Sequence, residues 1–292
     1  MYGRIKLIQF KIPSVVKLPE STSCTADYPP KLHDVLREAI KKVRHCRSGK
    51  QKSQRTPAYQ PASRPGPEHG GRFSAIPRGA RGTCYKARRD AYSRLLNHAT
   101  DLLGVLSALA LHDVVFVGHS VAAMIGVIAA VREPQRFAKM VLISPSPRFI
   151  NEKGYAGGFE QQDINELLGA MESDYRGWSQ GFAPVMMSQH ERPELVLELT
   201  NSFLRTNPAI AKHFARVTFF SDTRTELGFL TIPTLIVQSA HDVIAPLAVG
   251  HYLQEQLADS RLVVVATNGH CPHLSAPRET LAALDAFLAE GN

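Results

Sequence analysis

The sequence lacks the features of a membrane-spanning or disulfide-stapled protein. No apolar run reaches the roughly 18 residues that a spanning helix needs, so we expect no membrane association. The N-terminus has neither the apolar core nor the small-residue cleavage site of a secretory signal. The 4 cysteines are too few and too scattered for a disulfide scaffold, which favours a reducing, cytoplasmic location.

Acidic residues are scarce in the first part of the chain. Residues 1–90 contain 20 Lys and Arg against 6 Asp and Glu, a balance of +14, whereas residues 91–292 contain 14 against 20, a balance of −6. The two balances account for the net charge of +8. The chain therefore joins two different kinds of sequence, and only the second has the composition of an ordinary enzyme.

Residues 1–84 form a basic segment in which we expect little order. A strand within 5–12 and a helix near 31–45 are the regular elements that the apolar pattern allows. From Ser48 to Gly82 apolar periodicity is absent and Pro, Gly, Arg, Ser and Gln dominate, so burial cannot offset the entropy lost on ordering. We expect this stretch to be disordered. A tail of such charge can bind phosphate backbones, but no nucleic-acid fold signature accompanies it, so we expect no nucleic-acid partner.

Residues 85–292 alternate short apolar strands with helices. The predicted strands cover 114–117, 140–144, 234–238 and 262–265. A buried helix is predicted at 121–131, several short amphipathic helices at 161–217, and a final helix at 280–289. This alternation predicts an α/β fold in which a mostly parallel sheet is flanked by helices on both faces.

A serine lies at the sharp turn after the first of these strands. The sequence Gly118-His119-Ser120-Val121-Ala122 follows a strand and opens a helix, which is the context of a nucleophile elbow. Ala122 replaces the usual second glycine with the smallest side chain that carries a Cβ. A serine in this place is often only a helix N-cap. In the catalytic interpretation Ser120 is the nucleophile, and the backbone N–H of Val121 is one donor of an oxyanion hole.

A carboxylate and an imidazole follow the last two predicted strands. Asp242 comes after 234–238, and His270 comes after 262–265. The chain order Ser, Asp, His is that of α/β-hydrolases, in which the histidine takes the serine's proton and the carboxylate orients the imidazole. Asp222 is an alternative acid, but no strand precedes it. Taken singly, Asp242 could be a turn former and His270 a loop histidine.

Neighbouring histidines resemble a metal site. His270, Cys271 and His273 are closely spaced, but no second Cys/His pair lies at zinc-site spacing. We therefore predict no metal and no cofactor. His119 is expected to pack beside the elbow rather than to act as the base.

Several motifs resemble one subfamily of α/β-hydrolases. SPRF, GGFE and GHCPH, together with the segment VVFVGHSVAAMIGVIAAV, are similar to the RsbQ-like subfamily, which contains a bacterial stress regulator and the plant strigolactone and karrikin receptors. The resemblance extends from about residue 92 to the C-terminus. It implies an α/β-hydrolase fold with a helical cap at about 149–217. It also implies a serine hydrolase for a small apolar ester or lactone, with a stress-signalling role through a partner protein such as a phosphatase.

The resemblance also implies a pocket under the cap. The residues that would line it are Phe149, Phe159, Trp178, Phe182, Phe220, Val243 and Ile244. A concave, mostly apolar pocket suits a small hydrophobic ester. The alternative is that these side chains only fill the core of the cap.

The first ninety residues depart from the family. The resemblance implies a strand and then an oxyanion-hole turn near position 50, where this chain has Gly49-Lys50-Gln51-Lys52. His69-Gly70-Gly71 follows Pro and Gly residues rather than a strand, so the source of the second oxyanion donor is unknown. One hypothesis is that translation is out of frame upstream of a genuine hydrolase reading frame. We then expect an unpaired sheet edge, poor solubility and low activity.

Two further functions stay open at this stage. The chain could be a ligand-binding signalling protein with slow or no turnover, or an inactive, truncated or frameshifted hydrolase. Neither the identity of the substrate nor the oligomeric state follows from the residues.

Overall fold

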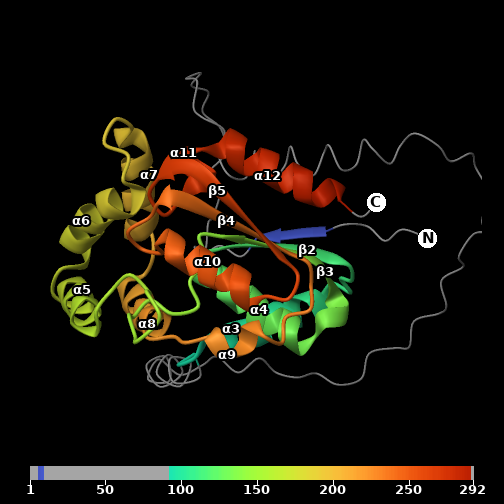
Figure 1. Cartoon of the computed structure of the whole chain (residues 1–292). Coiled ribbons are helices and arrows are strands. Elements are labelled where there is room, and N and C mark those ends of the chain that lie inside the picture. Colours follow the sequence, from blue (N-terminus) through green and yellow to red (C-terminus); the bar gives the residue numbers. More distant parts are fainter. Residues whose placement is uncertain (1–5, 10–91, 291–292) are drawn as a thin grey trace, which may run out of the picture.

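The computed structural model of the chain describes residues 6–9 and 92–290. Within these residues the centre of the molecule is a parallel sheet of five strands in the order β1-β2-β3-β4-β5 (Figure 1). The strands are β1 Lys6–Gln9, β2 Val114–His119, β3 Phe137–Ile143, β4 Thr234–His241 and β5 Ser260–Asn268. The α/β fold with a parallel sheet is thus confirmed.

Helices cover both faces of this sheet. Those that flank the strands are α3 Leu95–Ala108, α4 Val121–Arg132, α9 Arg224–Leu227, α10 Leu247–Gln256, α11 Pro272–Ser275 and α12 Pro277–Ala289, with a short 3₁₀ turn at Pro134–Arg136. Four more lie between β3 and β4: α5 Gln161–Ser173, α6 Tyr175–Met187, α7 Pro193–Leu204 and α8 Pro208–Phe219. We call these four the cap helices.

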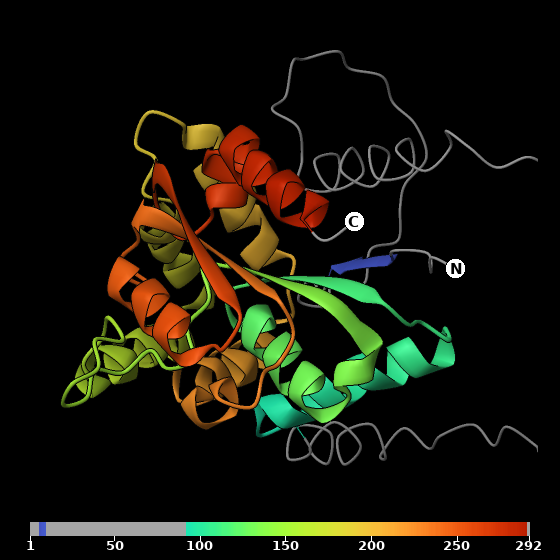
Figure 2. The ribbon, with the colours of Figure 1, turned by 45° about the vertical axis from the view of Figure 1, so that its right-hand side comes forward.

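Alternation along β2 divides the core into two layers. Val114 and Phe116 pack with buried side chains of α3, α4 and α10, whereas Val115 and Val117 pack with those of α12. Successive side chains of a strand point to opposite faces, so a run of apolar residues serves both layers. Figure 2 shows α12 on one side of the sheet and α3 with α4 on the other.

The edge of the sheet beside β2 is occupied by β1. Lys6–Gln9 pairs in parallel with β2 from Val114 to Val117. This confirms the strand expected within 5–12. It also corrects the expectation that this edge would be unpaired, because the four residues of β1 supply backbone partners to β2. The helix expected near 31–45 and the disordered stretch expected from Ser48 to Gly82 lie outside the described residues.

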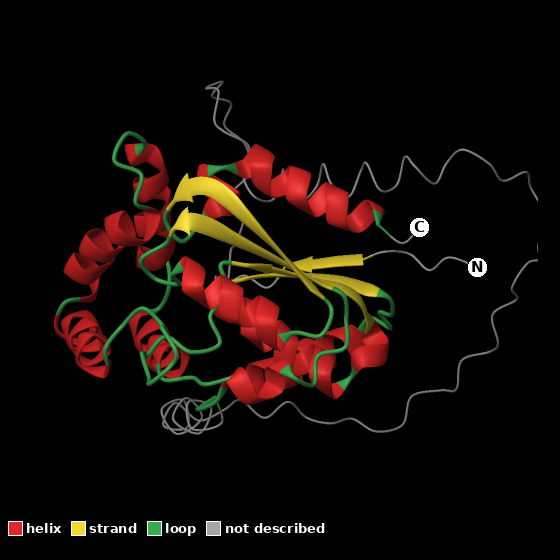
Figure 3. Cartoon of the chain, viewed as in Figure 1, coloured by secondary structure: helices red, strands yellow, loops and turns green. Residues whose placement is uncertain are grey.

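The cap helices lie at the carboxyl ends of the strands. Figure 3 shows the arrowheads of β4 and β5 pointing toward the side on which α6 and α7 lie. Ligands of open α/β sheets bind at this end of the strands. The sequence analysis did not anticipate two helices: α3, which packs against α4, and α10, which packs on β4 and β5. No helix of the described residues combines the length and apolar character needed to cross a membrane.

Candidate active site

Ser120 occupies a strained turn between β2 and α4. Its φ of 56° and ψ of −129° fall in a region that residues with a side chain rarely adopt. The backbone N–H of Ser120 donates to the carbonyl of Ile143 at 2.9 Å, which holds the turn against β3. A Cβ at Gly118 would lie 2.7 Å from the Phe116 ring and 2.8 Å from the backbone of Ala123, so the close approach of strand and helix requires glycine there.

Three side chains from three strand ends form a continuous hydrogen-bonded chain. Oγ of Ser120 lies 2.8 Å from Nε2 of His270. Nδ1 of His270 lies 2.7 Å from Oδ2 of Asp242. Because the strands are parallel, the ends of β2, β4 and β5 meet at one edge, and the structure brings these predicted residues together there.

The second oxygen of Asp242 is held by backbone groups. Oδ1 accepts hydrogen bonds from the N–H of Ile244 at 2.8 Å and from that of Ala245 at 3.1 Å. Burial alone would raise the pKa of Asp242, but the interaction with His270 and these backbone donors outweigh burial and keep the pKa below its usual value. The carboxylate of Asp242 is therefore held in one position and kept in its ionised form.

The loop that carries His270 is tied to the cap. The backbone N–H of His270 donates to the carbonyl of Met186, near the end of α6, at 2.7 Å. Gly269 has a φ of 88°, and a Cβ there would lie 2.0 Å from the carbonyl oxygen of Met187. Only glycine lets the loop pass this close to the cap. The sequence analysis missed Met186 and Met187 because a backbone contact leaves no side-chain signature.

His119 packs beside the elbow, as expected. Its Nε2 lies 2.7 Å from the carbonyl oxygen of His270, and since a carbonyl only accepts, Nε2 carries the proton. Burial, with a smaller contribution from His270, lowers the pKa of His119 to about 3, so its ring is neutral at ordinary pH. His119 therefore contacts the backbone of His270, whereas the nitrogen that faces Ser120 Oγ is Nε2 of His270.

The alternative acid Asp222 is engaged elsewhere. Its carboxylate accepts hydrogen bonds from Arg224 and from Arg148, the latter at 3.3 Å. Although its partial burial opposes the shift, these arginines lower the pKa of Asp222. Asp242, not Asp222, faces the imidazole of His270.

Most of the predicted pocket residues lie in one apolar cluster under the cap. The cluster contains Phe149, Phe159, Phe182 and Ile244, together with Ile164, Phe219 and Met186, which the sequence analysis did not name. Phe149 and Ile244 are buried. The ring of Phe149 lies 5.2 Å from that of Phe219.

The remaining predicted pocket residues differ in their surroundings. Trp178 stacks on Phe182 with ring centroids 4.9 Å apart and so borders the cluster. Phe220 and Val243 are 37% and 54% exposed and lie outside it. A separate cavity of about 440 Å³ between α6 and α7 contains none of the predicted site residues.

Val121 begins helix α4, so its backbone N–H has no acceptor within that helix. It lies directly after Ser120, where a donor can face an oxygen that develops negative charge on the substrate. The positions at which the sequence analysis sought a second donor, Gly49–Lys52 and His69–Gly71, lie outside the described residues.

The parallel sheet and the hydrogen-bonded arrangement of Ser120, His270 and Asp242 indicate the class of protein to which the chain belongs. A family model of the alpha/beta hydrolase fold matches residues 45–277, and the chain belongs to that family. The match begins well before residue 92, so it extends the resemblance into the segment that the sequence analysis set apart.

Similar proteins indicate which members of this family the chain resembles. A strigolactone esterase of Arabidopsis thaliana is 40% identical over 189 residues, which cover 64% of this chain and 70% of the relative. A karrikin insensitive 2 receptor of Petunia hybrida is 38% identical over 196 residues, covering 67% and 72%. The solved structure of a hydrolase from Oleispira antarctica has a TM-score of 0.67 at 39% identity, covering 70% and 74%. The RsbQ-like resemblance is thereby confirmed.

Proposed function

We propose that this chain hydrolyses a small apolar ester or lactone with Ser120 as nucleophile, His270 as general base and Asp242 as the orienting acid. The observation that carries the proposal is the unbroken series of hydrogen bonds from Ser120 Oγ through His270 to Asp242, at 2.8 and 2.7 Å. A serine hydroxyl alone is a weak nucleophile near neutral pH, and an adjacent base overcomes this. Relatives named as esterases support the reaction class.

In the acylation step, Ser120 Oγ attacks the carbonyl carbon of the substrate while its proton passes to Nε2 of His270. Asp242 holds Nδ1–H and stabilises the imidazolium that forms. The N–H of Val121 donates to the oxyanion. The proton on His270 then passes to the leaving alkoxide, which departs as an alcohol or, from a lactone, stays attached to the acyl group.

Hydrolysis of the acyl-enzyme regenerates the serine. His270 removes a proton from a water molecule, the resulting hydroxide attacks the ester carbonyl, and the returning proton restores the hydroxyl of Ser120. The backbone donors on Asp242 favour this cycle because they keep its carboxylate ionised throughout.

The apolar cluster under the cap supports a small hydrophobic substrate. Phe182 and Trp178 of α6 are only partly buried and present aromatic surface, whereas Phe149, from the loop after β3, is buried in the cluster. Such walls stabilise apolar groups by removing their surface from water. They distinguish substrates that differ by one methylene only weakly, so we propose a class of esters rather than a single compound.

The test compares Ser120→Ala with Ser107→Ala, a matched change at an exposed position of α3. We expect the first variant to lose hydrolysis of a p-nitrophenyl ester by about 10³-fold or more and the second to keep it. A fluorophosphonate probe should label the unaltered chain at Ser120, as located by peptide mass. Undiminished hydrolysis in Ser120→Ala, or labelling at another residue, would remove this assignment.

A signalling role is the second candidate, and the receptor-type relatives favour it. In that role the same pocket binds a small ligand and turnover is slow, while a cytoplasmic partner protein, such as a phosphatase, recognises the bound form. Many rapid turnovers without any ligand-dependent partner would argue for an enzyme. Capture of a partner only in the presence of ligand, with turnover near zero, would argue for a receptor.

A further inference from the structure

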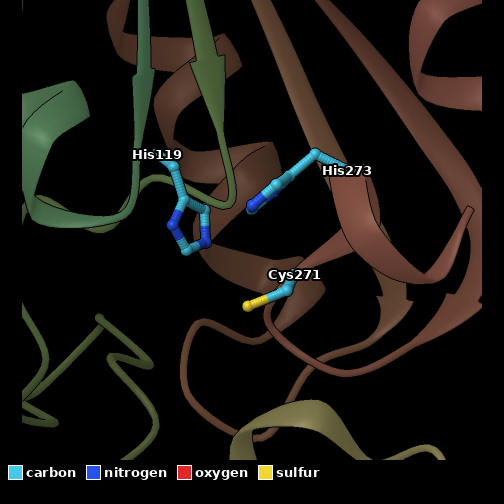
Figure 4. A group of neighbouring side chains, drawn as sticks. All are labelled: His119, Cys271 and His273. Atoms are coloured by element: carbon cyan, nitrogen blue, oxygen red, sulfur yellow. The ribbon is translucent and has the colours of Figure 1, made fainter. Parts of the chain in front are cut away.

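Three potential metal ligands converge beside the loop of His270 (Figure 4). His119 ends β2, while Cys271 and His273 follow β5. One ligand atom from each side chain lies within 4.8 Å of the other two. Cys271 and His273 are buried, and the imidazoles of His119 and His273 are 4.5 Å apart between centroids. The sequence analysis considered Cys271 and His273 together with His270 and predicted no metal, because His119 is distant along the chain and was not placed beside them.

We propose that His119, Cys271 and His273 bind one cuprous ion, and that its binding lowers the activity of the neighbouring Ser120–His270–Asp242 group. A thiol and two imidazoles are soft ligands, which favour Cu(I) and Zn(II) over Mg²⁺ or Ca²⁺. The charge of the ion selects between the first two. Cu(I) with one thiolate is neutral, whereas Zn(II) with one thiolate leaves a net positive charge that is costly to bury.

The protonation states of His119 and Cys271 fit a soft cation. His119 is neutral because burial lowers its pKa to about 3, and a neutral imidazole offers a lone pair to a metal. Burial, with a smaller contribution from the charge of Asp242, raises the pKa of the Cys271 thiol to about 12. The thiol therefore carries its proton until an ion with strong affinity for sulfur displaces it. Binding forms the Cu–S bond, breaks the S–H bond and releases one proton to the solvent.

Binding of an ion requires the three side chains to move slightly closer together. Ligand atoms at about 2.0–2.3 Å from a shared ion lie about 3.5–3.8 Å from one another in a trigonal arrangement. Because the ligand atoms already lie within 4.8 Å of one another, the side chains need to approach by no more than about 1 Å. Rotation about the χ angles of Cys271 and His119 can supply such a shift.

Binding at this group would disturb the proposed base. The proton on Nε2 of His119 is donated to the carbonyl of His270, and the lone pair lies on Nδ1. An ion that binds Nε2 displaces its proton to Nδ1 and so removes the hydrogen bond to His270, whereas an ion that binds Nδ1 disturbs this bond by moving the ring. The rings of His119 and His270 also lie only 5.0 Å apart, so closure on the ion affects both. This coupling, unlike the binding itself, rests on the proposed hydrolytic function.

The experiment titrates the full chain with Cu(I) under anaerobic conditions, using bicinchoninate as the competing chelator. All proteins carry C24S, C46S and C84S, which removes the other thiols of the chain. We expect one ion per chain and a copper–thiolate charge-transfer band in the near ultraviolet. Hydrolysis of a p-nitrophenyl ester should fall at least about tenfold at saturation and recover when the chelator is in excess.

Controls separate the site from other sources of binding. Cys271→Ser should lose the charge-transfer band, His273→Gln should bind at least about tenfold more weakly, and His251→Gln at an exposed position of α10 should bind normally. Each variant's activity with copper is compared with its own activity without it, and circular dichroism checks its fold. A band that persists in Cys271→Ser, or no band in the parent, overturns the site. Stoichiometric binding without loss of hydrolysis overturns the coupling, whereas an inactive parent that still shows the band contradicts only the proposed function.

Discussion

The backbone N–H of His270 donates to the carbonyl oxygen of Met186 at 2.7 Å, so a hydrogen bond joins the loop of the proposed base to the end of cap helix α6. The carbonyl of His270 also accepts a hydrogen bond, from Nε2 of His119 at 2.7 Å. His270 is therefore hydrogen-bonded both to the cap, through Met186, and to the elbow, through His119. Changes at either contact should alter catalysis even though neither contact touches the substrate.

Gly269→Ala tests the contact with the cap. The new Cβ would lie 2.0 Å from the carbonyl of Met187, and the φ of 88° disfavours any side chain. We expect kcat to fall at least about tenfold and stability to fall by more than the roughly 1–2 kcal/mol that backbone conformation alone costs.

Gly154→Ala is the matched control for this change. Gly154 also has a positive φ, at 81°, but a Cβ there meets nothing within 4 Å. It should lose stability by the backbone cost alone and keep its kcat. Equal effects of the two substitutions on kcat would mean that the packing of Gly269 against the cap is not what positions His270.

Asp242→Asn should remove the charge that orients His270 while preserving the shape of the side chain. The amide can donate to Nδ1 and so favour the wrong tautomer, for which a loss of about 10⁴ in kcat is expected. Because the pKa of Asp242 is held below its usual value, the carboxylate should stay ionised down to acidic pH in the unaltered chain. The measurement is kcat against pH for both proteins, and Asp222→Asn is the control that should retain activity.

The proximity of the three proposed catalytic residues followed from the sequence because each of them follows an apolar strand. Parallel strands bring their carboxyl ends to one edge, so strand order along the chain was enough to place Ser120, Asp242 and His270 together. The helix α3 has a clear apolar spacing but adjoins the basic segment, and α10 has a weak one. Neither was anticipated.

The pocket was less predictable. Phe219 is buried in the cluster while its neighbour Phe220 is exposed, and a rotation of about 100° between successive helical residues decides which of them faces inward. Two adjacent phenylalanines give no sequence signal for that choice. Contacts made by backbone carbonyls, such as that of Met186, leave no signal at all.

His119 should make the protein sensitive to acid. The unfolded chain protonates this histidine near its ordinary pKa of about 6.5, whereas burial lowers the folded pKa to about 3. Between these values the unfolded state binds more protons, so stability falls as pH drops through this window. The loss at pH 5 should be about 2 kcal/mol relative to neutral pH.

Urea unfolding at pH 7 and pH 5 measures this effect in His119→Gln, whose amide can still donate to the carbonyl of His270. The variant should lose less stability between the two pH values than the unaltered chain does. His190→Gln, at an exposed position, should lose as much as the unaltered chain. If His119→Gln also loses as much, another group is responsible for the acid sensitivity.

The stacked aromatics of α6 should limit the size of the acyl group. Trp178 and Phe182 stack at 4.9 Å, and Phe182 packs on the cluster under the cap. Phe182→Ala or Trp178→Ala should therefore widen acceptance toward longer p-nitrophenyl esters, at a cost in stability of about 1–3 kcal/mol for these half-buried rings. Phe229→Ala, at a residue that is 71% exposed, is the control. An unchanged chain-length profile in both α6 variants would mean that the rings only fill the cap.

The last prediction concerns the competence of the chain as written. A serine hydrolase needs donors aimed at the developing oxyanion, and loss of one costs about 10²–10³ in rate. Val121 supplies one such donor at the start of α4, but the sequence near position 50, Gly49-Lys50-Gln51-Lys52, has no glycine-flanked aromatic turn to supply the second. We therefore expect a kcat about 10²–10³-fold below that of the strigolactone esterase of Arabidopsis thaliana on the same ester. A turnover equal to that of the relative would refute this prediction, and would mean that residues 10–91 provide the missing donor.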